Sequence, residues 1–194
     1  MKIKSLIMLA AAVAMVSCGG NASKSSTNEQ QAEAAIEQAA MEIDALLTDA
    51  ANLTNQQVVI EGICTHICSH GGRKIFLMGS DDTKIIRIEA AELGAFDQKC
   101  VNSIVKVGGI LREERIDEEY LKQWEERIAT NTADEHGDDE SGCDTEKAAR
   151  GETGNTAAER IADFRTKIAA RNAAEGKEYL SFYFVEALAY EVVE

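Results

Sequence analysis

The sequence predicts a mainly β protein with helices, in which five strands form a small OB-like barrel. Five segments alternate apolar and polar residues with the period of a strand. The first of them contains a glycine, Gly62, that favours a bend, and a short helical stretch separates the third from the fourth. A helix before the first strand and a helical hairpin before the last complete the prediction. With 194 residues the chain is long enough for one domain with a buried core.

The start of the chain has the three regions of a secretory leader. Two lysines lie within the first four residues, residues 6–16 are apolar, and small residues precede Cys18. The apolar run is too short to span a bilayer as a mature helix. Cys18 is followed by two glycines and resembles the cysteine of a bacterial lipobox, with Met15 where leucine is commoner.

This resemblance implies that residues 1–17 form a lipoprotein signal peptide and that Cys18 is lipidated, with palmitate among its acyl chains. It also implies a protein anchored to the membrane of the bacterial cell envelope and facing the periplasm. An ordinary secretory signal with cleavage nearby is the alternative.

The segment before the predicted barrel divides into a tether and a helix. Residues 18–27 are rich in serine and are expected to form a flexible tether. Residues 28–53 have a helical pattern, because Ile36, Ala40 and Ile43 recur at spacings of four and three. This helix either docks on the domain or serves as an alanine-rich spacer.

Residues 56–194 are the predicted OB-like domain. Gly71 and Gly72 predict a hairpin turn between the first two strands. Regular alternation would place Phe182, Phe184 and Tyr190 on one face of the last strand. The strands are expected at 57–68, 73–78, 84–89, 103–111 and 178–193, with the short helix at 90–99.

The helical insertion is expected at about 117–176. Asp117 is placed to cap a first helix, whose Tyr120, Leu121, Trp124 and Ile128 share one side. Thr156 and Glu159 form a capping box that opens a second helix, and Gly176 closes it. We expect the two helices to pair as an antiparallel hairpin. The segment between them, 131–155, is acidic and lacks an apolar period, which predicts disorder.

Several short motifs occur along the predicted barrel. They are Val58-x-Ile60-x-Gly62, His66-x-Cys68-x-His70-Gly71-Gly72, Val105-x-Val107-x-Gly109-x-Leu111 and Arg115-Ile116-Asp117-Glu118-x-Tyr120-Leu121-x-x-Trp124-Glu125. Together with the closing strand they resemble a group of uncharacterised bacterial lipoproteins that have an OB-like domain. The likeness covers roughly residues 56–128 and 178–193. It implies a fold and an envelope location, but no activity.

The segment from Cys64 to Gly72 holds two of the five cysteines and two of the three histidines. In a regular strand Cys64 and His70 would lie ~20 Å apart and could not share an ion. Cys64 continues an apolar face and is predicted to be a buried core residue. His66, Cys68 and His70 remain as candidate ligands of Zn, Cu or haem. The alternative is a polar turn whose imidazoles bond to the backbone.

The other cysteines leave the disulfide pattern open. In an oxidising compartment Cys64, Cys68, Cys100 and Cys143 could form two bridges in three connectivities. A bridge between Cys64 and Cys68 requires a broken strand, because a regular one separates their Cα atoms by ~13 Å. Cys100 is expected to be a buried thiol. Cys143 lies in an acidic segment that lacks the residue order of an EF-hand calcium loop.

Charge and motifs narrow the class of function. The net charge is −14, or −16 without the two lysines of the leader, and such a chain repels nucleic acid. The sequence has no Gly-x-Ser-x-Gly elbow, phosphate-binding glycine loop or His-Glu-x-x-His helix. Cys68 between His66 and His70 could be an activated thiol, but there is no Cys-x-x-Cys redox motif. An enzyme is therefore the least supported class.

These observations predict a non-catalytic envelope lipoprotein whose OB-like domain binds a ligand or a partner. In one version, the His66/Cys68/His70 turn binds a transition metal or haem. In the alternative, the domain recognises another envelope protein or a glycan and has no metal site. The membrane, through Cys18, is a partner in both versions.

Overall fold

The computed structural model of the protein describes residues 36–69, 71–131 and 143–193. The predicted leader and tether lie outside the described residues, as do the first part of the predicted N-terminal helix, Cys18 and His70. Predictions that concern those residues therefore stay predictions.

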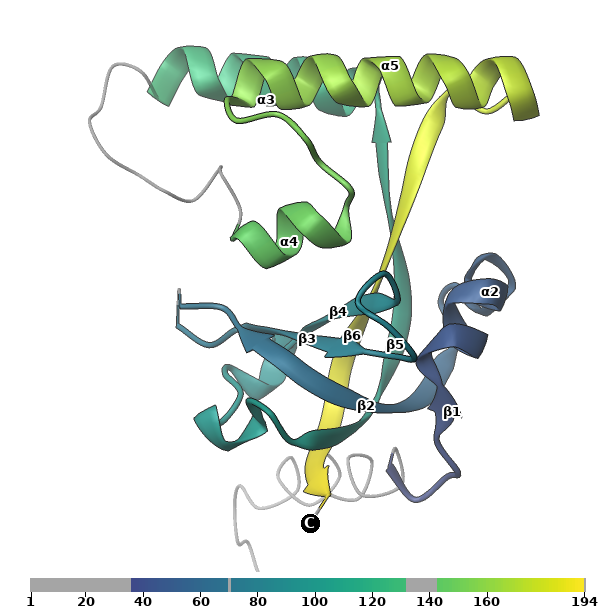
Figure 1. The fold of residues 1–194 in the computed structure, drawn as a ribbon, viewed down its shortest axis with the longest axis vertical. Helices are drawn as coiled ribbons and strands as arrows, with labels where there is room; N and C mark the ends of the chain where they lie inside the picture. The colour runs from purple at the N-terminus through teal and green to yellow at the C-terminus, as the bar shows by residue number, and fades with distance from the viewer. Residues whose placement is uncertain (1–35, 70, 132–142, 194) are drawn as a thin grey trace, which may run out of the picture.

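Five strands close into a barrel (Figure 1). Each strand pairs with the next in the order β2, β3, β4, β6 and β5, and β5 pairs back with β2. The pairing of β4 with β6 is parallel and the other pairings are antiparallel. The predicted OB-like barrel is thus confirmed. The strands are β2 (Gln57–Ile67), β3 (Lys74–Met78), β4 (Ile85–Glu89), β5 (Ile104–Asp117) and β6 (Tyr179–Val193).

The barrel encloses the larger of two hydrophobic cores. Alternate residues of each strand point inward, as the period of a strand requires, and among them are Ile60, Leu77 and Val107. Helix α2 (Ile43–Leu53) packs against this core through Ile43, and a side chain at Gly62 would collide with Ile43.

A β-bulge in β2 reverses the faces of the strand near its end. The register with β3 shifts between Cys64 and His66. Cys64 therefore belongs to the barrel core, whereas His66 lies opposite Phe76, whose neighbours Ile75 and Leu77 point inward. In a regular strand Cys64 and His66 would share one face, and the bulge places them on opposite faces.

A second bulge lies where β5 pairs with β6. Gly108 is opposite Ala189 and Gly109 is opposite Ala187, so Leu188 is the extra residue and is 41% exposed. The prediction that Phe182, Phe184 and Tyr190 share a face is wrong, because this extra residue reverses the alternation. Phe182 packs with the helices, whereas Tyr190 packs against the barrel core.

Beyond the barrel, β5 and β6 continue as a two-stranded arm, residues 112–117 and 179–184, that carries the helical insertion (Figure 1). The insertion contains α3 (Glu118–Asn131), α4 (Asp144–Ala149) and α5 (Ala157–Glu175). The second core joins α3, α5 and the arm through Ile116, Leu121, Trp124, Ile161 and Phe164. In Figure 1, α4 lies between the barrel and these helices.

The helix ends agree with the sequence. The Asp117 carboxylate accepts a hydrogen bond of 2.9 Å from the Tyr120 amide. Thr156 and Glu159 form the predicted capping box, and Gly176 ends α5 in the left-handed conformation with φ of 68°. The capping residues thus predicted the start of α3 and both ends of α5 correctly.

Three predicted elements differ in the structure. In the described part of the helix expected over 28–53, residues 37–40 are not helical and Met41–Glu42 (β1) pairs in parallel with β2, so α2 begins at Ile43. The short helix at 90–99 is two separate 3-10 turns, Ala91–Leu93 (η1) and Gln98–Cys100 (η2). The segment expected to be disordered includes α4, which docks on the barrel through ion pairs. Such long-range pairs leave no local pattern in the sequence.

Candidate functional site

The candidate site is a cavity between the outer face of β3 and β4 and the helical insertion. Its volume is about 320 Å³, and ligand pockets typically measure about 300–1,000 Å³. In this barrel β3 and β4 are the second and third strands, which is the face that OB folds use for binding. The barrel contributes Lys74, Arg87 and Glu89 to the lining, the arm contributes Glu114, and the helical insertion contributes the rest.

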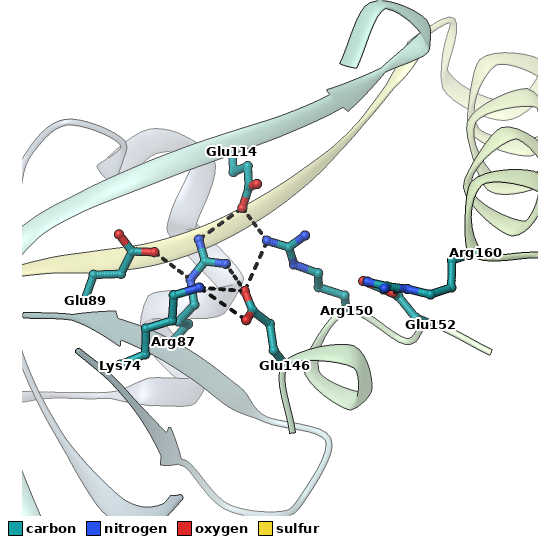
Figure 2. Close-up of polar contacts among 8 residues, drawn as sticks. All are labelled: Lys74, Arg87, Glu89, Glu114, Glu146, Arg150, Glu152 and Arg160. Carbon is teal, nitrogen blue, oxygen red and sulfur yellow. Dashed lines mark hydrogen bonds and ion pairs between the residues drawn. The ribbon is translucent and has the colours of Figure 1, made fainter. Parts of the chain in front are cut away.

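Arg87 is the centre of the barrel side of this cavity (Figure 2). Its Nη1 donates to Glu146 at 2.6 Å and its Nη2 to Glu114 at 3.0 Å, while Nε lies 3.2 Å from Glu89. The guanidinium also lies over the ring of Phe184, 4.7 Å from its centroid. Burial lowers the pKa of Arg87, but the three glutamates outweigh it and raise the pKa, so the side chain stays charged.

Glu146 connects α4 to the barrel. Besides Arg87, it accepts hydrogen bonds from Lys74 Nζ, which is 3.3 Å from both carboxylate oxygens, and from Arg150 Nη2 at 3.4 Å. Burial raises the pKa of Glu146, but the charges of these three cations hold it below its ordinary value. Arg150 Nη2 also donates to Glu114 at 2.6 Å. The short helix is therefore held by a network of buried charges.

Glu152 and Arg160 form a separate pair nearer α5 (Figure 2). Arg160 Nε donates to Glu152 Oε2, and the guanidinium lies 4.7 Å from the centroid of the Trp124 ring. The Glu152 side chain is only 1% exposed. Its other oxygen, Oε1, is buried and has no hydrogen-bond partner among the described residues. A buried acceptor without a donor costs about 1–3 kcal/mol, so this atom marks where a donor would be stabilised.

The lining has an electrostatic balance unlike that of the whole chain. Five cationic and four anionic side chains line the cavity, whereas the chain as a whole has a net charge of −14. An anionic ligand group is therefore less repelled in this cavity than over the rest of the protein. The aromatic side chains of Tyr120 and Trp124 form the apolar part of the wall.

Two of the three residues predicted to bind a metal, His66 and Cys68, lie on the same outer face, and the third, His70, lies outside the described residues. The imidazole of His66 is 5.9 Å from the Phe76 ring, and its Nε2 is buried without a hydrogen-bond partner among the described residues. Cys68 is 9% exposed, and its amide donates to the Lys74 carbonyl at 2.8 Å. Within the described part of the chain no three histidine, cysteine or acidic side chains are grouped to hold a metal. His66 and Cys68 alone are too few for the four-coordinate site of structural zinc.

Sequence reasoning did not find the cavity, because its residues are spread from Lys74 to Arg160. One local sign was present. Arg87 and Glu89 alternate with the buried Ile86 and Ile88 in β4, so both charges lie on the face away from the core. That pattern is also expected for any solvent-facing strand, and only the docked insertion makes it part of a site.

The comparisons with known proteins leave these residues without a precedent. No family model matches the chain, and a search of curated proteins finds no relative. Among the described helices none is long and apolar enough to cross a membrane.

Proposed function

We propose that this protein is a non-catalytic lipoprotein of the bacterial envelope that binds a polar ligand in the cavity between β3–β4 and the helical insertion. The observation that carries the proposal is the buried Oε1 of Glu152, which has no hydrogen-bond partner in the part of the chain that the structure describes and lies in a cavity lined by charged side chains. The envelope location is supported by the leader and by the resemblance of the Cys18 segment to a lipobox.

The cavity defines the chemistry of the ligand. Glu152 Oε1 needs a hydroxyl or N–H donor, and the slight cationic excess of the lining favours an anionic group on the same ligand. A cell-wall disaccharide peptide has both, since its sugars supply hydroxyls and its peptide supplies carboxylates. Binding of oligosaccharides is also one of the uses to which OB barrels are put. We therefore propose envelope glycan of this kind as the ligand class.

The test is a calorimetric titration of the full chain with a soluble disaccharide peptide prepared from bacterial cell walls. We expect binding, and we expect Glu152→Gln to weaken it by about tenfold to a hundredfold, because the loss of one good hydrogen bond to a charged group costs about 1.5–3 kcal/mol. In that variant the amide oxygen of Gln accepts the hydrogen bond from Arg160. Its NH₂ group, which is a donor, takes the position of Oε1, so the acceptor for the ligand is lost.

Glu92→Gln is the matched control, because Glu92 is an exposed glutamate of η1 outside the cavity. Its binding should equal that of the wild type. Titrations with the disaccharide alone and with the peptide alone separate the two halves of the ligand. Absence of binding to all three probes would contradict the proposal. Equal binding by Glu152→Gln and the wild type would show that the cavity is not the site.

A second candidate is the metal or haem version, supported by Nε2 of His66, which has no hydrogen-bond partner within residues 36–69, 71–131 and 143–193 and lies on the same face as Cys68. Metal content of the reduced chain, purified without oxygen and compared with His66→Ala, distinguishes it from the first. Metal near zero in the wild type excludes this version and leaves the glycan proposal unaffected.

A further inference from the structure

The four cysteines of the described residues form two pairs on opposite sides of the sheet, because the bulge in β2 separates Cys64 from Cys68. Cys64, before the bulge, belongs to the barrel core together with Cys100, and both are 0% exposed. Cys68, after the bulge, is opposite Lys74, whose side chain reaches the outer face and contacts Glu146. Cys143 is the residue at which α4 begins on that same face.

The inner pair is close but protected. The carbonyl of Cys64 accepts a hydrogen bond of 2.8 Å from the Asn102 amide, and the carbonyl of Cys100 accepts one of 3.0 Å from Ser103. Burial, and then the nearby Cys100, raise the pKa of Cys64 to about 11. Since the thiolate is the reacting form, burial and the raised pKa both slow the oxidation of this pair once the protein has folded.

The outer pair flanks one ion pair. The Cys68 amide donates to the Lys74 carbonyl at 2.8 Å, and Lys74 Nζ is 3.3 Å from the carboxylate of Glu146. The Cys143 carbonyl accepts from the Lys147 amide at 3.0 Å, so Cys143 lies one helical turn from Glu146. The pKa of Cys143 is raised by burial first, and the nearby Cys68 contributes to the same shift. Cys143 is also the more exposed of the two thiols.

We propose that Cys68 and Cys143 form a disulfide that tethers α4 to the end of β2, while Cys64 and Cys100 remain core thiols. A disulfide between a core cysteine and an outer cysteine is excluded, because the bridge would have to pass through the sheet. Among the connectivities that the sequence left open, the structure therefore favours the one that joins Cys68 to Cys143.

The bridge forms by thiol–disulfide exchange with a disulfide oxidant such as oxidised glutathione or a dithiol oxidase. The Cys143 thiolate attacks the oxidant and forms a mixed disulfide, which releases one thiol of the oxidant. The Cys68 thiolate then attacks Sγ of Cys143 and releases the second thiol. Two protons and two electrons leave the protein, and the oxidant is reduced to two thiols.

The tether would act on the candidate site. Glu146 of α4 and Arg150, the C-cap residue of α4, line the cavity, so a covalent link at Cys143, the N-cap residue, holds this wall of the cavity in place. The pairing does not depend on the identity of the ligand. A failed titration with cell-wall fragments would therefore leave this inference intact.

The test is peptide mapping of the full chain. The folded protein is exposed to oxidised glutathione, its remaining thiols are alkylated, and it is then digested with trypsin without reduction. Trypsin places Cys64 and Cys68 in peptide 25–73, Cys100 in 100–106, Cys143 in 128–147 and Cys18 in 5–24. We expect peptide 25–73 to be linked to 128–147, and peptide 100–106 to be alkylated. The proposal would be overturned by any of three other disulfides. These are a link between peptides 25–73 and 100–106, a link between peptides 100–106 and 128–147, and a bridge within peptide 25–73.

Two variants identify the cysteine used within peptide 25–73. Cys68→Ser should abolish the link, whereas Cys64→Ala should retain it, and the reverse result contradicts the inference. Hydrogen exchange gives a second readout, because the amides of α4 should exchange about tenfold more slowly in the bridged wild type than in Cys143→Ser. Equal exchange rates would show that the bridge does not hold α4. A Cys143 that remains glutathionylated, or is not oxidised at all, would also refute the pairing.

Discussion

Arg87 is the single residue on which the barrel side of the candidate site depends. Its side chain is 10% exposed and pairs with Glu89, Glu114 and Glu146, which come from three different elements. A buried ion pair contributes little by itself, because desolvation offsets the attraction between the charges. Removing one partner is costly, because the remaining charges stay buried without compensation.

We therefore expect Arg87→Met to lower the free energy of unfolding by about 3 kcal/mol. This value is the lower end of the range for a broken buried ion pair, because Lys74 and Arg150 still neutralise Glu146 in the variant. Urea unfolding followed by circular dichroism measures this loss.

Arg165→Met is the matched control. Arg165 also contacts two glutamates, Glu118 and Glu125, but it lies on the surface of the helical insertion. Exposed ion pairs contribute little to stability, so the control should lose much less than Arg87→Met. Equal losses in the two variants would contradict the assignment of Arg87 as the organising residue.

At the scale of elements, α4 depends on its docking. It has six residues, and isolated helices shorter than about 12–15 residues are marginal in water. Glu146 is its buried residue, so charge pairing rather than apolar burial holds it on the barrel.

This dependence predicts a loss of stability in acid. The pKa of Glu146 is lower in the folded protein than its ordinary value of 4.5, so the unfolded chain takes up the proton at a higher pH than the folded chain. The contribution of Glu146 is therefore fully present above pH 4.5 and is lost as the pH falls through its folded pKa.

Urea unfolding of the wild type and of Glu146→Gln at a series of pH values measures this contribution. The difference between the two proteins should shrink as the pH is lowered below the ordinary pKa. A difference that is constant from neutral to acid pH would show that Glu146 is not held ionised by its partners.

Elements were predicted well where local rules decide them. Thr156, Glu159 and Gly176 mark the ends of α5 by side-chain chemistry that acts within a few residues, and the structure confirms both ends. The bulges were not predictable, because inserting one residue into a ladder depends on the partner strand. The faces of His66 and Leu188 were decided in this way.

At the scale of the whole molecule, two cores are joined by the arm of β5 and β6 (Figure 1). The barrel alone would present β3 and β4 to solvent. The insertion, held at the end of the arm, turns this face into a cavity because α4 folds back between the two cores (Figure 1). The candidate site is therefore a product of the complete chain and of no single element.

The proposed anchor belongs to this scale as well. We expect cells that express the full chain to incorporate labelled palmitate into it, because the sequence around Cys18 resembles a lipobox. Cys18→Ala should abolish the label and release the protein from the membrane fraction. Cys143→Ser, which keeps Cys18, is the control and should be labelled like the wild type. Equal labelling of Cys18→Ala and the wild type would contradict the anchor.

The sequence by itself determined the OB-like barrel, the two capped helices of the insertion and the burial of Cys64 and Cys100. Each follows from periodicity or from contacts between near neighbours along the chain. Only the tertiary structure decided that Cys68 and Cys143 lie near each other, that α4 docks on Arg87, and that Glu152 lies in a cavity. The physical reason is that these features depend on strand register and on charge pairs between distant residues, which local patterns do not encode.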